Sequence, residues 1–310
     1  SASGTAQPES PSSSAAPNAS SSSSSVSQSP EFPALYFDEQ EIAVLDALLA
    51  NWAAVSEEEE ENGHNVAVYF KDLDSGVEYI YNGEREFFIA SLNKAPYAMY
   101  LYHLVETGKT SLADTYYVSK EALASSAENS GKIKDDPDLP RNFTLEELIF
   151  YLLRYSDTGA LRILLKHFPA DGYLEYSKTF GMHHPDEIGN LINGRICALD
   201  AGIYLKNMFQ YLENGVYGEE FKEHLLNTRY PMIRSEYEVV RKYGWDKNAY
   251  HDMAIVYAPH PYLLAILTDK SAGTAAELSM FSTIAKTLET MMENKWEKVE
   301  EKESLSDFTP

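Results

Sequence analysis

The sequence has a single cysteine, Cys197, so no disulfide can form within the chain. We interpret Cys197 as a small buried apolar residue rather than a reactive thiol. No stretch of about 18 consecutive apolar residues occurs, which argues against a membrane-spanning helix. The phosphate-binding loop, the dinucleotide-binding fingerprint and the G-x-S-x-G nucleophile turn are also missing. These absences exclude several common enzyme classes.

Basic residues are scarce: 25 Lys and Arg stand against 48 Asp and Glu, giving a net charge of -23. Long-range repulsion then argues against a nucleic-acid partner. Hydrophobic residues make up 44% of the 310 residues, which is enough for a sizeable core. The length fits one large domain or two small ones.

The first 30 residues contain 14 serines and only one charged residue, Glu9. Such a segment cannot bury apolar area, and it lacks the basic start and apolar stretch of a signal peptide. We therefore predict a disordered Ser-rich tether over residues 1–35, a folded domain over 36–300 and a polar tail over 301–310. A serine-rich stalk ahead of a folded domain suits an exported protein, although an ordinary disordered tail gives the same composition.

Hydrophobic periodicity predicts helices and strands in an order that suggests one sheet covered by helices. Residues 109–143 and 169–195 are expected to be mainly irregular. Helices are expected from Phe37 through Trp52, with the acidic run 57–61 as a solvated helix end, and over 91–108, 145–154, 160–167, 199–212 and 274–296. Strands are expected over 66–70, 78–81, 239–242, 253–257 and 262–268. We expect the early and late strands to share one antiparallel sheet with the two terminal helices on one face.

Ser91 and Lys94 lie three residues apart where an apolar run gives way to a helical pattern. Residues three apart share a helix face, so the spacing predicts the lysine amine near the serine hydroxyl. Serine is a weak nucleophile until a base takes its proton, and a lysine can be that base when its pKa is lowered. This spacing alone occurs often by chance, so its meaning depends on the rest of the chain.

Two further motifs follow in order. A Ser-Asp-Thr sequence lies between two predicted helices, and a Lys-Tyr-Gly sequence lies at the end of a predicted strand. The set S-x-x-K, S-D-N and K-T-G marks β-lactamases and penicillin-binding proteins. The matching positions are Ser91/Lys94, Ser156/Asp157/Thr158 and Lys242/Tyr243/Gly244. The chain therefore resembles the class A β-lactamase-like, penicillin-binding serine hydrolases over residues 37 to 296.

The resemblance implies an α/β fold in which an all-α lobe inserts into a domain with an antiparallel five-stranded sheet and flanking helices. It also implies roles for single residues. Ser91 would be the nucleophile and Lys94 its base, Ser156 would pass a proton to the leaving nitrogen, and Lys242 would bind the substrate carboxylate. The backbone N–H groups of Ser91 and Trp245 would form the oxyanion hole. Further substrate contacts would come from Asp157, Thr158, Tyr243 and Gly244.

The chain departs from the family pattern at three places. Thr158 replaces an asparagine whose amide can both donate and accept hydrogen bonds. Tyr243 replaces a small hydroxyl residue and either narrows the cleft or turns away from it. The Glu-x-x-Leu-Asn element, which supplies the deacylating base of efficient class A enzymes, is missing. Glu187 is the nearest candidate base, but its spacing to Asn190 differs, so we expect acylation with slow release.

Other histidines carry weaker hypotheses. His183 and His184 are adjacent, and no nearby cysteine or carboxylate pattern has metal-ligand spacing, so we interpret them as loop residues. His251 and Asp252 lie in a predicted strand, where successive side chains point to opposite faces and cannot pair. We expect no metal and no other cofactor.

The leading hypothesis is an exported serine acyl-transfer hydrolase acting on a β-lactam or a peptidoglycan-type peptide, and we expect a monomer. A second hypothesis keeps the chemistry but makes a D-Ala-D-Ala peptide, or another cell-surface ester or amide, the substrate. A third is a non-catalytic binding or sensing domain that kept the fold. A Tyr243 that fills the cleft, together with the absence of a Ser91–Lys94 contact, would favour the third. A cleft that reaches Ser91, with both lysines converging there, would favour an enzyme.

Overall fold

The computed structural model describes residues 35–54, 65–124, 131–184, 190–270 and 275–306. Five strands form one antiparallel sheet in the order β2-β1-β9-β8-β7. The strands are β1 (Val66–Asp72), β2 (Glu78–Tyr81), β7 (Val239–Asp246), β8 (Ala249–Val256) and β9 (Tyr262–Thr268). This confirms the predicted antiparallel sheet, in which early and late strands pair.

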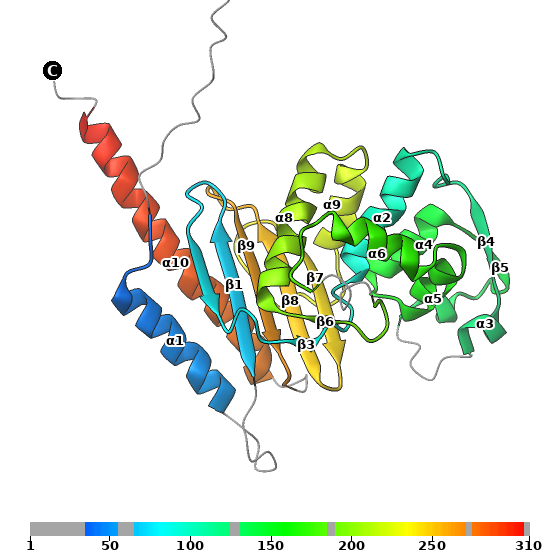
Figure 1. The fold of residues 1–310 in the computed structure, drawn as a ribbon, viewed down its shortest axis with the longest axis horizontal. Coiled ribbons are helices and arrows are strands. Elements are labelled where there is room, and N and C mark those ends of the chain that lie inside the picture. The colour runs from blue at the N-terminus through cyan, green and yellow to red at the C-terminus, as the bar shows by residue number, and fades with distance from the viewer. Residues whose placement is uncertain (1–34, 55–64, 125–130, 185–189, 271–274, 307–310) are drawn as a thin grey trace, which may run out of the picture. The chain divides into compact units, whose positions relative to one another are not determined.

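The two faces of the sheet bury different helices because side chains alternate along each strand. On β1, Val66, Val68 and Phe70 pack into a core with α1 (Glu39–Ala54) and α10 (Ala275–Ser306). Ala67 and Tyr69 face the other core, which includes α8 (Ala198–Asn214). Figure 1 shows α1 and α10 side by side on one face of the sheet, as predicted for the terminal helices.

A helical region connects β3 (Phe87–Phe88) with β6 (Arg195–Ile196), which pair as a two-stranded sheet. Within this region α2 (Lys94–Glu106) is buried on most sides, as expected of a helix that is apolar around its circumference. The other helices of the region are α3 (Lys120–Ala124), α4 (Leu145–Arg154), α5 (Thr158–His167) and α6 (Ala170–Lys178). The insertion implied by the family resemblance is thus present, but it is not all-α, because it also contains two short strands over residues 115–118 and 141–144 (Figure 1).

Local sequence explains where α4 begins. The Thr144 hydroxyl accepts from the Glu147 N–H at 3.1 Å, and the Glu147 carboxylate accepts from the Thr144 N–H at 2.8 Å. These reciprocal bonds form a capping box, which satisfies two N–H groups that the first turn leaves free. The Thr-x-x-Glu spacing in the sequence is typical of such a box.

The predictions failed in two loop-rich regions. Residues 109–143 contain a second two-stranded sheet of β4 (Thr115–Val118) and β5 (Arg141–Thr144), and a 3₁₀ turn at Ile133–Asp135. Residues 169–195 contain α6, which buries only Tyr173 and Ser177. Both regions were missed because short polar elements that bury few side chains leave little hydrophobic periodicity.

Several predicted boundaries also differ. The last helix was predicted to end near residue 296 and the polar tail to begin at 301, but α10 continues to Ser306. Glu and Lys favour helix in this stretch after the regular apolar pattern ends. Strand β7 runs beyond the Lys-Tyr-Gly motif to Asp246, so the motif lies inside the strand. An additional helix, α9 (Gly218–Leu226), follows α8.

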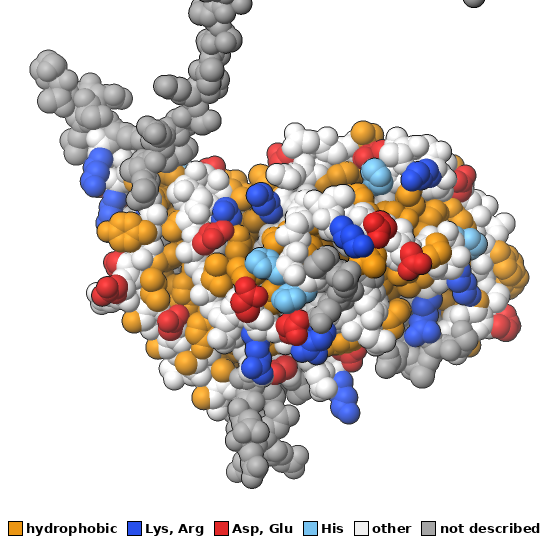
Figure 2. Space-filling view, in the orientation of Figure 1, with side chains coloured by type: hydrophobic (Ala, Val, Ile, Leu, Met, Phe, Trp, Pro, Cys, Tyr) orange, Lys and Arg blue, Asp and Glu red, His pale blue; other side chains and the backbone are white. Residues whose placement is uncertain are grey.

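The surface carries a mixture of charged and apolar side chains. Figure 2 shows acidic and basic side chains interspersed with apolar ones on the face that it presents. Among the described residues, no helix combines the length and the apolar character needed to cross a bilayer.

Candidate active site

A pocket of about 320 Å³ brings together residues from all three sequence motifs. Ser91, Ser156 and Tyr243 line it, and Trp245 forms part of its wall. These residues come from the turn before α2, the turn before α5 and the edge strand β7. The motifs are therefore neighbours in space although more than 60 residues separate the first from the second.

Ser91 lies in a tight turn rather than in the first turn of a regular helix. The Leu92 N–H donates to the Ile89 carbonyl at 3.2 Å, and the Lys94 N–H donates to the Ser91 carbonyl at 3.3 Å. Ala90, directly before Ser91, has φ +49°, a left-handed conformation that costs free energy for a residue with a Cβ. Backbone strain of this kind is typical of functional turns, and it leaves Ser91 at the pocket surface.

Lys94 is almost fully buried and points towards the Ser156 turn. Its Nζ donates to the Ser156 carbonyl at 2.5 Å, to Thr158 Oγ1 at 3.3 Å and to Ser156 Oγ at 3.5 Å. Among the described residues, no hydrogen bond joins the Ser91 hydroxyl to the Lys94 amine.

Lys242 reaches the same serine from the other side. Its Nζ donates to Ser156 Oγ at 2.9 Å and to the Tyr243 carbonyl at 2.7 Å, and the side chain is fully buried. The Tyr243 ring centroid lies 4.3 Å from this amine, which is a cation–π distance. Tyr243 lines the pocket beside this amine, whereas Lys242 is not among the lining residues.

Both lysines bind protons less tightly than an exposed lysine does, mainly because they are buried. Burial lowers the pKa of Lys94 to about 8, and the nearby Asp157 carboxylate opposes this shift. Burial, and next the charge of Lys94, hold the pKa of Lys242 well below its ordinary value, although Asp252 opposes them. A lysine whose pKa is lowered in this way is available as a neutral amine near neutral pH, as a general base requires.

Ser156 is held in an unusual conformation between these amines. Its φ is +52°, again the left-handed region for a residue with a Cβ. The Asp157 N–H donates to the Tyr151 carbonyl at 3.1 Å, which fixes the turn to the end of α4. The side chain is nearly buried yet touches the pocket, so its hydroxyl can exchange a proton between a lysine and a bound molecule.

Asp157 lies behind the pocket rather than on its wall. Its fully buried carboxylate accepts from the N–H groups of Lys132, Ile133 and Ala160 at 2.6, 2.8 and 2.9 Å. It therefore caps α5 and fixes the adjoining 131–135 segment. The sequence prediction of a direct substrate contact is replaced by a positioning role, because all three contacts are backbone groups of the protein.

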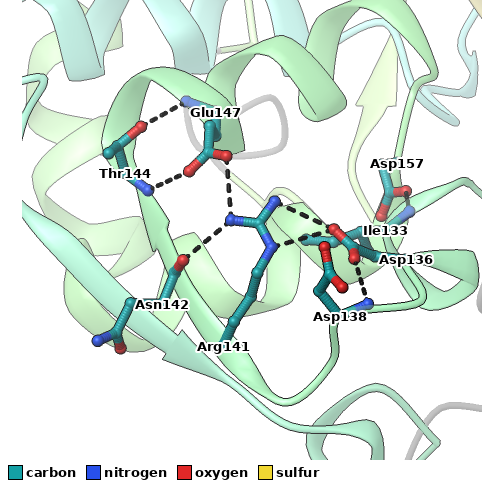
Figure 3. A network of polar contacts seen from close by, with 8 residues as sticks. All are labelled: Ile133, Asp136, Asp138, Arg141, Asn142, Thr144, Glu147 and Asp157. Carbon is teal, nitrogen blue, oxygen red and sulfur yellow. Dashed lines mark hydrogen bonds and ion pairs between the residues drawn. The ribbon is translucent and has the colours of Figure 1, made fainter.

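Figure 3 shows the network that extends this support outward. The Arg141 guanidinium donates to the Glu147 carboxylate at 3.0 Å and to the Asp136 carboxylate at 3.0 and 3.1 Å. Asp136 in turn accepts from the Asp138 N–H at 2.8 Å. Arg141 thus ties the capping box of α4 to the segment that Asp157 holds.

Gly244 allows β7 to approach the Ser91 turn closely. A Cβ at this position would lie 3.2 Å from the Ala90 Cβ, the Ile89 carbonyl oxygen and Leu92 Cγ. A larger residue would push the strand away from the turn. The predicted glycine thus contributes space between the two elements that carry Ser91 and Trp245, and Trp245 itself is about half exposed.

The structure adds pocket residues that the motifs did not indicate. Arg229 and Lys247 bring two cations to the wall, and Tyr155 and Tyr230 bring two aromatic rings. Tyr230 packs edge-on against Tyr243 and Trp245, with centroids 5.4 and 5.3 Å away. No signal in the sequence singled these residues out, because their neighbours in the pocket come from distant segments.

Two further hypotheses from the sequence concern His251 with Asp252, and Glu187. His251 and Asp252 have separate partners, which confirms that they do not pair. His251 accepts from the Thr268 N–H and contacts the Phe88 carbonyl, and burial lowers its pKa to about 4. Asp252 binds Arg241 and two backbone N–H groups on the other side of the strand. Glu187, the candidate deacylating base, lies outside the described residues.

A family model matches most of the chain. The model of the β-lactamase enzyme family matches residues 50–291. No curated protein matches the chain by sequence.

Three solved structures illustrate the likeness in fold. A β-lactamase from Sphaerobacter thermophilus has 19% identity and a TM-score of 0.67, with 81% of this chain and 95% of that chain covered. A structure of PBP-A has 15% identity and a TM-score of 0.68, with 84% and 98% covered. A mutant of PBP-A, solved as an acyl-enzyme complex with penicillin G, has 14% identity and a TM-score of 0.69, with 84% and 99% covered.

Proposed function

Because the chain belongs to the β-lactamase enzyme family, we propose that it is an exported serine hydrolase in which Ser91 forms an acyl-enzyme with β-lactams or related amides. The observation that carries this proposal is the convergence of Lys94 and Lys242 on Ser156 beside the pocket that exposes Ser91. By the criterion set from the sequence, this convergence beside an open serine favours an enzyme. Export rests on the Ser-rich tether over residues 1–35 and on the family.

The proposed acylation needs two proton transfers, one from the Ser91 hydroxyl and one to the leaving nitrogen. The neutral Lys94 amine takes the Ser91 proton, through the Ser156 hydroxyl or after a small rotation of the serine side chain. The Ser91 oxygen then bonds to the substrate carbonyl carbon, and the amide C–N bond breaks. Ser156 gives a proton to the leaving nitrogen and is reprotonated by the neighbouring lysines, which makes it a proton shuttle.

The tetrahedral intermediate carries a negative oxygen that needs donors. We propose the backbone N–H groups of Ser91 and Trp245 for this role, supported by the close packing of Gly244 on the Ser91 turn. Loss of one such donor typically lowers the rate by a factor of about 10² to 10³. The cations Arg229 and Lys247 on the pocket wall are suited to hold a substrate carboxylate, because Tyr243 covers Lys242.

Deacylation is proposed to be slow. The segment after the Ser-Asp-Thr motif lacks the Glu-x-x-Leu-Asn element, and Glu187 is the remaining candidate base. Without a carboxylate that activates water, the ester on Ser91 has no efficient route to hydrolysis. The protein then behaves more like a penicillin-binding protein than like an efficient β-lactamase.

Intact-mass measurement after incubation with penicillin G tests this proposal. We expect an adduct of one penicillin per chain on the wild type and none on Ser91→Ala. Ser75→Ala is the matched control, since Ser75 lies in the turn between β1 and β2 and lines no part of the pocket. An adduct of equal size on Ser91→Ala, or none on the wild type, contradicts the proposal.

One observation favours a second candidate, a non-catalytic sensing domain. Tyr243 is buried against Lys242, and the Ser91 hydroxyl has no hydrogen bond to Lys94 in the described structure. Reversible, saturable binding of penicillin G without a mass increase would support this candidate. Turnover of a D-Ala-D-Ala peptide without turnover of nitrocefin would instead keep the enzyme and change its substrate.

A further inference from the structure

Three segments that are distant in the sequence meet at the beginning of α8. The turn at residues 82–85 contributes Glu84, the segment after α6 contributes His184, and Cys197 directly precedes α8. One ligand atom from each of these residues lies within 4.8 Å of those from the other two. Near the centre of the face drawn in Figure 2, histidine side chains lie next to acidic ones.

Backbone contacts fix these segments to one another. The Leu199 N–H donates to the Gly83 carbonyl at 3.2 Å, which attaches the Glu84 turn to the first turn of α8. The fully buried Asp200 carboxylate accepts from the His183 N–H at 2.6 Å and from the His184 N–H at 3.2 Å. Because α8 holds both neighbours, the positions of Glu84 and His184 relative to Cys197 are set by the fold and not by chance contact of long side chains.

The side chains differ in how freely they move. His184 Nε2 lies 3.9 Å from Glu84 Oε2, and His183 Nδ1 lies 4.0 Å from Glu84 Oε1. Cys197 is completely buried, His184 is about one-third exposed and Glu84 is mostly exposed. A fixed thiol therefore lies beneath an imidazole and a carboxylate that can adjust their positions.

From this arrangement we propose that Glu84, His184 and Cys197 form a binding site for a zinc(II) ion, with water in the fourth position. Thiolate sulfur, imidazole nitrogen and carboxylate oxygen are the ligands that zinc takes in proteins, at about 2.0 to 2.3 Å. Tetrahedral bonds of this length separate ligand atoms by about 3.5 Å, so the cluster must contract by about 1 Å. The exposed Glu84 side chain can make most of this movement.

The chemistry of binding is simple. The Cys197 sulfur loses its proton to solvent when the metal binds, while His184 binds as a neutral ring. Asp200 holds the backbone of the histidine segment and does not itself bind the ion, a supporting role that outer residues commonly have at metal sites. The three ligands are not at regular spacing in the sequence and come together only in the fold, so the sequence gives no sign of this site.

The site is separate from the proposed acylation chemistry. None of its three ligands lines the pocket of Ser91, and none contacts Lys94 or Lys242. The zinc ion would fix the segment that follows α6 to α8. A failure of acylation and a failure of metal binding are therefore distinguishable outcomes.

Cobalt(II) gives a direct test because the chain has only one cysteine. Titration of the untagged, reduced full chain with cobalt(II) should produce a thiolate-to-cobalt charge-transfer band that saturates at one equivalent. Zinc(II) should abolish the band by displacing cobalt and should raise the melting temperature by mass action. No band, or a band that zinc(II) does not displace, overturns the proposal.

Variants identify the other ligands. Glu84→Gln and His184→Asn should each weaken zinc(II) binding by more than the tenfold to about hundredfold loss typical of an outer-shell change. Cys197→Ser should lose the band, and the two surface variants keep the test valid if this buried substitution destabilises the fold. Glu86→Gln and His167→Asn are matched controls and should bind zinc(II) as the wild type does. Wild-type affinity in both Glu84→Gln and His184→Asn would refute the site.

Discussion

Strand β7 carries two buried cations in succession, Arg241 and Lys242, and their surroundings differ. Arg241 Nη1 lies 3.2 Å from the buried Asp252 carboxylate, so its charge is balanced. Lys242 donates only to a hydroxyl and a carbonyl, and it faces a second lysine through Ser156. Among the described residues, no carboxylate forms an ion pair with Lys242.

The different surroundings of Arg241 and Lys242 indicate different roles, one in stability and the other in function. Each charge in a buried ion pair loses its hydration, and the opposite charge of its partner offsets this cost. Removing one member leaves the other charge buried and unbalanced. An unpaired buried lysine instead holds a lowered pKa, which costs folding free energy and supplies a neutral amine. On this account Arg241 serves the fold, whereas Lys242 and Lys94 serve the chemistry at Ser91.

The largest effect should come from breaking the ion pair. Arg241→Met should lower the free energy of unfolding by about 3 to 5 kcal/mol, because Asp252 is then buried without its counter-ion. Lys242→Met removes the free-energy cost of burying an amine with no counter-ion and should leave the stability unchanged or raise it. Urea denaturation of both variants measures the contrast, and equal losses in the two would remove the distinction.

The acylation rate, unlike the stability, should depend on the lysines that have no counter-ion. Lys94→Met should slow the formation of the penicillin adduct by at least about 100-fold, the usual contribution of a positioned base. The wild-type rate should rise with pH and level off above about 8, where Lys94 becomes neutral. Rapid-quench mass spectrometry across pH 6 to 9 would measure both. A rate that falls over this range would exclude Lys94 as the base.

The same lysine should lower stability near neutral pH. The pKa of Lys94 is about 8 in the folded chain against 10.5 as its ordinary value, so the unfolded chain binds more protons between these values. The free energy of unfolding therefore rises with pH between these two values, because the cost of burying the protonated Lys94 amine is progressively lost. Below pH 8 that cost is fully present. Lys94→Met should be more stable than the wild type at pH 7 by about 2 kcal/mol.

Chemical denaturation at pH 7 and at pH 10 would check the sign. The advantage of Lys94→Met should shrink at the higher pH. Lys71→Met is a suitable control, because Lys71 is partly exposed and pairs with Glu78 at the surface. A variant that is less stable than the wild type at both pH values would contradict the assigned burial cost.

The smallest effect concerns the ring that covers Lys242. Tyr243→Thr should open the amine to the pocket and raise the acylation efficiency for an anionic β-lactam severalfold. Tyr243→Phe keeps the ring and should behave as the wild type. Second-order acylation rates of the three proteins give the comparison, and an equal gain in both variants would assign the effect to the hydroxyl.

The sequence predicted the sheet, most helices and the three motifs because these depend on local patterns. Val66 to Phe70 and Tyr262 to Thr268 are apolar enough to identify their strands, and Thr144 with Glu147 identifies the beginning of a helix. Motif order also anticipated that Ser91 and Ser156 would share a pocket.

The features that could not be predicted from the sequence depend on contacts between segments that are distant along the chain. Arg229 and Lys247 enter the pocket through the path of the chain around β7, and Glu84 meets Cys197 only because the Gly83 carbonyl binds α8. Asp157 changed from a substrate ligand to a positioning residue because its partners come from the 131–135 segment.

The most direct test of the account is time-resolved mass spectrometry with penicillin G, followed by peptide mapping of the adduct. The account predicts one penicilloyl group on the peptide that contains Ser91, formed faster at pH 8.5 than at pH 6 and retained after excess penicillin is removed. An adduct on any other peptide, or no adduct at either pH, would contradict the claim that the two buried lysines activate Ser91.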